Sequence, residues 1–156
     1  MTTSEQEIVV HRSVTVPLPK ERAFTLFTER MGAFWPSGYS IGTAATADVL
    51  VEPRAGGRWY ERGVDGSECD WGRVAEWTPP GRVVLLWQIT GEWRYDPAFA
   101  TEVEVSFTDA GPGTSRVDLR HRHLERFGEH ADAIRATFDS PGGWAGILAR
   151  FADLAQ

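Results

Sequence analysis

The chain has a single cysteine, Cys69, among its 156 residues. One thiol cannot form an intramolecular disulfide, and it cannot supply the several thiolates of a cysteine-rich zinc site. A disulfide framework and that class of metal site are therefore excluded. Because disulfides are rare in reducing compartments, a chain without them is expected to work in the cytoplasm.

The sequence also lacks an excess of positive charge and a long apolar run. Its formal net charge is −6 and its pI is near 5.2, which disfavours nucleic acid and anionic membrane surfaces as partners. No apolar stretch approaches the length needed to cross a bilayer, and the N-terminus has neither the basic nor the apolar region of a signal peptide. We expect a soluble, unprocessed protein, monomeric or homodimeric, that binds no nucleic acid and no membrane.

Motifs for catalysis and cofactor binding are missing as well. There is no Gly-x-Ser-x-Gly sequence and no glycine-rich phosphate loop before a helix, and the strand around Cys69 offers no basic neighbour that would activate the thiol. The pairs Gly56-Gly57 and Gly142-Gly143 are better explained as a strand bulge and the start of a helix. These absences favour a binding protein without a cofactor over an enzyme.

What the chain has in quantity is tryptophan, within an ordinary globular composition. Hydrophobic residues make up 42% and charged residues 24%, as in folded domains. We expect one domain over residues 1–156, large enough to bury roughly 70% of its unfolded surface. The seven tryptophans either fill the core or line a cavity for a flat apolar ligand, since each brings a large apolar body and one N–H group.

Alternating and helical patterns divide the chain into a sheet and several helices. Turn signals such as Asp65-Gly66 and Pro80-Gly81 predict that consecutive strands are antiparallel neighbours. Alternation of apolar and polar residues predicts strands over 8–16, 48–52, 58–62, 69–77, 82–89, 101–108 and 115–123. Two short helices are expected after the first strand, one through 23–30 and one over 32–36, and another over 131–138.

The last seventeen residues, 140–156, are predicted to form one amphipathic helix. Ser140 would cap this helix, and Pro141 suits its first position because proline has no N–H group. The apolar stripe consists of Trp144, Ile147, Leu148, Phe151 and Leu154. A stripe this broad requires a curved sheet to cover it, so we expect an α+β fold with ligand space between sheet and helix. The small, polar linker 37–46 is the expected mobile entrance.

Strand parity predicts which side chains face that space. On the strand 115–123, His121 and His123 share a face with two apolar residues and are expected to point inward. Parity on the other strands, the helix stripe and the position of Trp35 near one end of the sheet complete the set. The predicted ligand-contact residues are Trp35, Trp59, Glu61, Trp87, Phe107, His121, His123, Trp144 and Leu148.

The pair His121-x-His123 admits three interpretations. Two imidazoles on one side of a strand could bind a metal, but no spacing selects a third ligand among Glu61, Glu125 and His130. A pair of Glu61 and a histidine could perform general acid–base catalysis. We favour the third interpretation, in which the histidines hydrogen-bond each other, a backbone carbonyl or a ligand, so no metal is expected.

Five stretches of the chain carry a family resemblance. They are Phe34-Trp-Pro36, Gly56-Gly-Arg-Trp-Tyr-Glu61, 71–87, 114–121 and Gly143-Trp144. In this order they resemble the bacterial proteins similar to the C-terminal domain of the activator of Hsp90 ATPase, in the START-like (SRPBCC) superfamily. The resemblance implies a helix-grip (START/Bet v 1-like) fold, in which a seven-stranded antiparallel sheet wraps a long C-terminal helix around a hydrophobic cavity. It implies lipid or polyketide binding, toxin sequestration, cyclisation or co-chaperone action.

These observations predict that the chain binds a hydrophobic, aromatic or polycyclic small molecule between the sheet and the C-terminal helix, for sequestration or resistance. One alternative is a cyclase- or hydratase-like enzyme acting on a polyketide-type substrate. Another is a stress-related protein-interaction module, which becomes the better interpretation if the tryptophans fill the interior and leave no cavity.

Overall fold

The computed structural model describes residues 7–36 and 38–156 of the chain. Its seven strands are β1 (Val10–Val16), β2 (Thr46–Val51), β3 (Arg58–Gly63), β4 (Glu68–Thr78), β5 (Arg82–Trp87), β6 (Thr101–Gly111) and β7 (Thr114–Arg122). Its helices are α1 (Lys20–Glu29), α2 (Met31–Phe34), the 3₁₀ helix η1 (Leu124–His130), α3 (Ala131–Asp139) and α4 (Trp144–Leu154).

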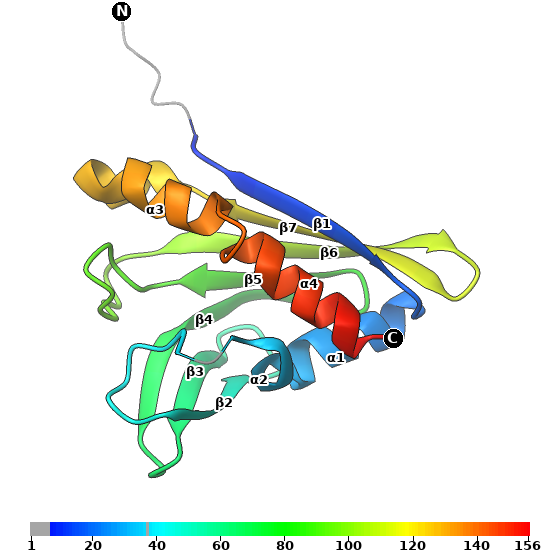
Figure 1. Ribbon diagram of the computed structural model, residues 1–156, viewed down its shortest axis with the longest axis horizontal. Helices are drawn as coiled ribbons and strands as arrows, with labels where there is room; N and C mark the ends of the chain where they lie inside the picture. Colours follow the sequence, from blue (N-terminus) through cyan, green and yellow to red (C-terminus); the bar gives the residue numbers. More distant parts are fainter. Residues whose placement is uncertain (1–6, 37) are drawn as a thin grey trace, which may run out of the picture.

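One antiparallel sheet contains all seven strands in the order β1-β7-β6-β5-β4-β3-β2. The sheet is curved, and α4 lies across its concave face (Figure 1). The helix α3 leads into α4 along this face, while α1 and α2 lie near the other end of α4 (Figure 1). This arrangement confirms the predicted α+β helix-grip fold, with two short helices after the first strand.

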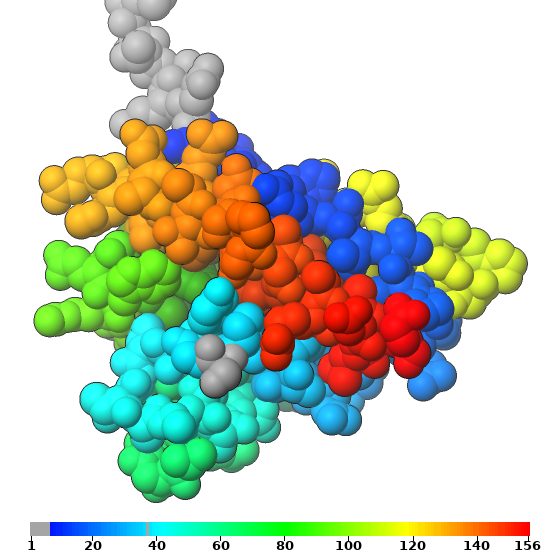
Figure 2. Space-filling view, in the orientation of Figure 1, coloured from blue at the N-terminus to red at the C-terminus, as the bar shows by residue number. Residues whose placement is uncertain are grey.

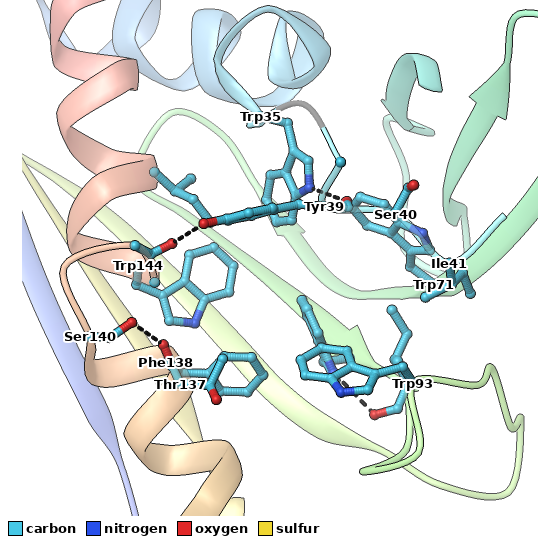
Figure 3. Close-up of a pocket in the computed structure, with 16 residues that line it drawn as sticks. Trp35, Tyr39, Ser40, Ile41, Trp71, Trp93, Thr137, Phe138, Ser140 and Trp144 are labelled. Carbon is cyan, nitrogen blue, oxygen red and sulfur yellow. Dashed lines mark hydrogen bonds between the residues drawn. The ribbon is translucent and has the colours of Figure 1, made fainter. Parts of the chain in front are cut away.

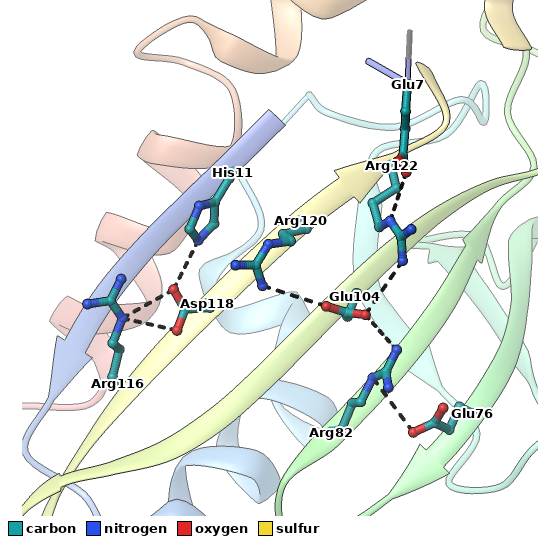
Figure 4. Close-up of polar contacts among 9 residues, drawn as sticks. All are labelled: Glu7, His11, Glu76, Arg82, Glu104, Arg116, Asp118, Arg120 and Arg122. Atoms are coloured by element: carbon teal, nitrogen blue, oxygen red, sulfur yellow. Dashed lines mark hydrogen bonds and ion pairs between the residues drawn. The ribbon is translucent and has the colours of Figure 1, made fainter. Parts of the chain in front are cut away.

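Alternation along the strands determines which side chains face α4. In β7, Val117, Leu119 and His121 are fully buried, as their parity predicts. The intervening polar residues lie on the outer face of the sheet, where Glu104 Oε2 accepts a hydrogen bond from Arg82 Nη2 at 2.5 Å (Figure 4). Such surface pairs contribute little stability individually. Because the charged side chains occupy this face of the sheet, the apolar side chains lie on the opposite face and form the core.

The interior is divided between two aromatic clusters. The phenylalanine cluster has ring centroids 5.3–5.9 Å apart and consists of Phe24, Phe27, Phe34, Phe107 and Phe151. The tryptophan cluster has centroids 5.0–6.4 Å apart and consists of Trp35, Trp59, Trp71, Trp87 and Trp144. The first cluster packs under the C-terminal half of α4 and the second near its first turn, so the two ends of the interior differ in shape and chemistry.

The helix α4 begins at Trp144, and the predicted start at Ser140 is wrong. Ser140 ends α3 instead, because its hydroxyl donates to the carbonyl oxygen of Thr137 at 2.7 Å. In the turn that follows, a Cβ at Gly143 would lie 2.3 Å from the carbonyl oxygen of Phe138. Glycine therefore permits the close approach of α3 and α4 at this point.

Replacing Phe151 by alanine tests the packing of α4. Phe151 is fully buried, and its ring lies 5.3 Å from the rings of Phe27 and Phe34. We expect Phe151→Ala to lower the free energy of unfolding by about 3–5 kcal/mol through a cavity in the core. The exposed Asp153 of the same helix provides the control, because Asp153→Ala should change that free energy by less than about 0.5 kcal/mol. Equal unfolding midpoints in denaturant for both variants would contradict this packing.

Candidate binding pocket

A pocket of about 460 Å³ lies between the sheet and the N-terminal end of α4. Its walls come from β4, β5, α3, α4, the loop 38–41 and the loop that follows β5. These segments meet on one face of the molecule, where the loop is cyan, α3 is orange and the segment after β5 is green (Figure 2). The lining residues are Trp35, Gly38, Tyr39, Ser40, Ile41, Trp71, Trp87, Ile89, Trp93, Thr137, Phe138, Ser140, Gly142, Gly143, Trp144 and Ile147.

The walls of the pocket are mostly aromatic. Five of the seven tryptophans line it, together with one tyrosine and one phenylalanine (Figure 3). The lining residues described include no aspartate, glutamate, lysine, arginine or histidine. Aromatic walls with a few polar groups are typical of sites for apolar small molecules, and stacking and burial would supply most of the binding free energy here.

The carboxylate of Glu61 holds one wall of the pocket from behind. Its Oε1 accepts hydrogen bonds from the Ile41 N–H at 2.7 Å and from Trp71 Nε1–H at 2.8 Å. Its Oε2 accepts a third from the Gly42 N–H at 3.3 Å. The residue is 2% exposed, and these three N–H groups compensate for its removal from water. Glu61 thus ties the loop 38–42 and the indole of Trp71 to the sheet.

Two further hydrogen bonds fix the same loop at its other end. Trp35 Nε1–H donates to the carbonyl oxygen of Tyr39 at 2.8 Å, and the Tyr39 hydroxyl donates to the carbonyl oxygen of Gly142 at 2.9 Å (Figure 3). The loop therefore bridges the end of α2 and the turn between α3 and α4. It forms the rim of the pocket on this side.

His121 fixes the indole of Trp144 through a buried chain of hydrogen bonds. Trp144 Nε1–H donates to His121 Nδ1 at 3.1 Å, and an indole N–H can only donate, so Nδ1 carries no proton. The proton is then on Nε2, which donates to Thr101 Oγ1 at 2.7 Å. Burial lowers the pKa of His121 to about 3, so the imidazole is neutral at neutral pH and orients a wall of the pocket.

The structure places three of the predicted contact residues in the pocket wall, namely Trp35, Trp87 and Trp144. The other six do not line it. Trp59, Glu61, Phe107, His121 and Leu148 are buried behind the wall or in the phenylalanine cluster. Strand parity for the first four and the helix stripe for Leu148 correctly predicted that these residues point inward. Neither pattern distinguishes the residues that contact a cavity from those that pack beneath its wall.

The expected inward direction of His123 is wrong. The strand β7 ends at Arg122, and His123 has a left-handed backbone with φ of 66°. This conformation interrupts the alternation and turns the side chain toward the surface. There Nδ1 lies 3.6 Å from a carboxylate oxygen of Glu7 and 3.6 Å from one of Glu125. His121 and His123 therefore do not share a face and do not form the pair that the sequence suggested.

Several wall residues were missed by the sequence prediction. Trp71 lies on β4, where register irregularities against both neighbouring strands obscure parity. Tyr39 and Phe138 reach the pocket through tertiary contacts of a loop and of α3. For Trp93 the signal was present, because an aromatic residue in a polar loop after a strand is exposed unless it folds over a cavity. The structure places Trp93 at the pocket wall.

The single thiol of the chain, Cys69, is not among the residues that line this pocket. Burial, followed by the charge of Glu61, raises the pKa of the Cys69 thiol, which is the opposite of activation. Within residues 7–36 and 38–156, no group of three His, Cys, Asp or Glu residues is placed to hold a metal ion. None of the helices in this described part is long and apolar enough to cross a membrane.

Comparison with known proteins identifies a family. The family described as activator of Hsp90 ATPase homolog 1-like protein matches residues 17–156. A search of curated proteins finds no match. Among solved structures, an HSP90 activator from Plasmodium falciparum is 19% identical, with 74% of this chain and 72% of that chain covered and a TM-score of 0.51. At this identity the likeness shows the fold alone.

Two solved structures are more similar in sequence. The anthrahydroquino-γ-pyrone synthase Txn09, complexed with SUM, is 40% identical, with 94% of this chain and 96% of that chain covered and a TM-score of 0.66. The self-sacrificing resistance protein CalC from Micromonospora echinospora is 32% identical, with 94% of this chain and 93% of that chain covered and a TM-score of 0.65.

Replacing Glu61 by glutamine tests how the pocket rim is held. In this variant the side-chain amide would direct its NH₂ group at an N–H donor that now hydrogen-bonds to a carboxylate oxygen, and two donors cannot bond to each other. We expect Glu61→Gln to lower the free energy of unfolding by about 1–3 kcal/mol and to speed hydrogen exchange at the amides of Ile41 and Gly42. Glu68→Gln, at an exposed position of β4, is the control. Unchanged exchange at Ile41 in Glu61→Gln would show that the carboxylate does not hold the loop.

The pH dependence of stability tests the environment of His121. Burial lowers its pKa from the ordinary value of 6.5, which applies in the unfolded chain, to about 3 in the folded protein. The unfolded chain therefore binds the extra proton between these values, and stability is lost as the pH falls from about 6.5 toward 3.

His121→Gln keeps a hydrogen-bonding side chain but removes this titration. We expect the parent protein to lose up to about 1.4 kcal/mol more per pH unit than His121→Gln between about pH 6 and pH 4. The comparison uses the slopes of unfolding free energy against pH, because the absolute stabilities also differ. Parallel slopes would mean that His121 is protonated in the folded protein.

Proposed function

The chain belongs to the family of activator of Hsp90 ATPase homolog 1-like proteins, and we propose that it binds a planar, polycyclic aromatic small molecule in the pocket at the N-terminal end of α4. The observation that carries this proposal is the wall of the pocket, to which five tryptophans, one tyrosine and one phenylalanine contribute. Flat rings bury large areas against such side chains and stack on them in favourable geometries.

The size and polarity of the pocket support this class of ligand. A volume of about 460 Å³ lies within the usual range for small-molecule sites, which is about 300–1,000 Å³. The hydroxyls of Tyr39, Thr137 and Ser140 already donate to backbone carbonyl oxygens. A ligand with many unpaired charges would lose its hydration here without compensation. The preferred ligand is therefore apolar over most of its surface.

The two more similar structures support the same chemistry. The name of the first, an anthrahydroquino-γ-pyrone synthase, refers to a fused aromatic ring system. The second is a resistance protein described as self-sacrificing. With identities of 40% and 32% over nearly the whole chain, ligands of related chemistry are the natural candidates for this pocket, with sequestration or resistance as the role of binding.

A second candidate function is ring closure in such a molecule. The observation in its favour is the word synthase in the name of the 40% identical structure. The pocket would act mainly by holding a flexible precursor in a folded, reactive conformation. Among the described lining residues, Tyr39 carries a phenolic hydroxyl at the pocket rim, where it could contact an oxygen atom of the precursor. Tyr39→Phe would then slow product formation more than it weakens binding.

Binding is tested by filling the pocket. Ile147 is a buried lining residue on α4, whereas Leu154 is exposed at the far end of the same helix. We expect dihydroxyanthraquinone to bind the parent protein and Leu154→Trp with equal affinity. Ile147→Trp, which adds the same indole inside the pocket, should bind at least about tenfold more weakly. Calorimetry measures the affinities, and circular dichroism checks that both variants fold.

Mass spectrometry separates binding from catalysis. Incubation with a panel of aromatic metabolites in excess has three informative outcomes. Recovery of unchanged ligand supports binding, formation of more product molecules than protein molecules supports an enzyme, and stoichiometric cleavage of the chain supports self-sacrifice. If the parent protein binds no flat aromatic probe, the proposed function is wrong and a protein-interaction role becomes the better interpretation.

A further inference from the structure

The indole of Trp93 occupies an unusual position at the mouth of the pocket. Trp93 lines the pocket, yet 46% of its surface is exposed. Its backbone is left-handed, with φ of 62°. Glycine and asparagine adopt this conformation readily, but for a bulky side chain it is strained. A large apolar residue is thus held in an unfavourable backbone conformation, and burial of its side chain does not compensate for the strain.

The surrounding structure enforces this conformation. Ile89 and Tyr95 form an isolated antiparallel bridge, and between them the Thr90 N–H donates to Arg94 O at 2.8 Å. The Trp93 N–H donates to Thr90 O at 2.9 Å. The loop also packs closely against the end of η1, since a Cβ at Gly91 would lie 2.8 Å from the His130 side chain. The tip is therefore a fixed turn that holds Trp93 at the mouth of the pocket.

Packing within the protein does not explain the strain. Among the described residues, the one aromatic ring that pairs with Trp93 is Phe138, at 6.3 Å between centroids and with an interplanar angle of 84°. This edge contact leaves much of the indole free. Strained residues that the rest of a structure holds in place cluster at ligand sites. The strain at Trp93 is consistent with a side chain directed at a ligand.

A second exposed aromatic residue faces Trp93 from the opposite rim. Tyr39 is 45% exposed, and its hydroxyl and carbonyl groups are fixed by Gly142 and Trp35. The close-up view shows Tyr39 and Trp93 on opposite sides of the opening, with Trp144 and Phe138 on a third side (Figure 3). Two large rings at opposite edges of an aromatic pocket can stack on a flat ligand. They stabilise the binding of a flexible apolar chain less, because such a chain offers no flat face for stacking.

From this arrangement we infer that Trp93 is a specificity-determining residue, whose indole stacks on a flat, fused-ring ligand and selects it over flexible apolar molecules of similar size. The inference rests on the proposed binding function and adds to it the residue and the shape of ligand. The strained tip of the loop after β5 positions the indole before the ligand arrives, so little side-chain entropy is lost on binding.

The test compares two substitutions at position 93 and two probes. Trp93→Asn suits the left-handed backbone and removes the ring, whereas Trp93→Phe retains a ring. Dihydroxyanthraquinone is the flat probe and dodecanol the flexible one, with affinities measured by calorimetry. We expect Trp93→Asn to bind the flat probe about tenfold more weakly and Trp93→Phe within about threefold of the parent, since one aromatic stacking contact is lost only in the first.

Two further readouts distinguish selective stacking from general damage. Dodecanol affinity should change by less than about twofold in both variants, and the melting temperature of Trp93→Asn should equal or exceed that of the parent because backbone strain is relieved. Equal loss of affinity for both probes, or no loss for either, would overturn the role of Trp93 while leaving the pocket intact. Failure of the parent protein to bind either probe would instead refute the proposed function.

Discussion

One short helix cannot cover the whole concave face of a seven-stranded sheet. The helix α4 has eleven residues and is about 16 Å long, whereas the eleven residues of β6 extend over about 36 Å. Other segments must close the remainder. The phenylalanine cluster and the helices α1 and α2 fill one end of the interior. At the other end the loop 38–42, α3 and the turn after β5 meet without filling it, and the pocket remains there.

Two buried polar side chains, Glu61 and His121, shape this pocket without lining it. Glu61 ties the loop and Trp71 to the sheet, and His121 fixes Trp144. Both act from one layer behind the wall, where their hydrogen bonds are satisfied and their desolvation is compensated. The surface that a ligand meets is therefore aromatic and rigid. The proposed recognition of ring systems, and the proposed ring closure in a folded precursor, both rest on this surface.

Local alternation was sufficient to predict the seven strands and the inward side chains of β3, β5, β6 and β7. Helical spacing predicted the apolar stripe of α4 except at Leu154, which is exposed. Three wall residues were predicted, namely Trp87 from strand parity, Trp144 from the helix stripe and Trp35 from its position near one end of the sheet. Apart from Trp93, the other features of the site depended on structure that leaves no local signal in the sequence. A left-handed backbone turns the side chain of His123 toward the surface. Bulges obscure the parity of β4, and contacts with residues distant in sequence position the loop that carries Tyr39. The predicted start of the last helix at Ser140 was wrong because Ser140 is the C-cap of α3, and α4 begins four residues later.

The indole N–H signals of the seven tryptophans provide the most direct test, measured by nuclear magnetic resonance during titration with dihydroxyanthraquinone. The pocket predicts large shifts for the signals of Trp35, Trp71, Trp87, Trp93 and Trp144. Trp59, fully buried with its Nε1–H directed at Met31 Sδ, and Trp77, at the other end of the interior beside Phe24, should keep their signals. Shifts confined to Trp77, or no shifts at saturating probe, would contradict a binding site at the N-terminal end of α4.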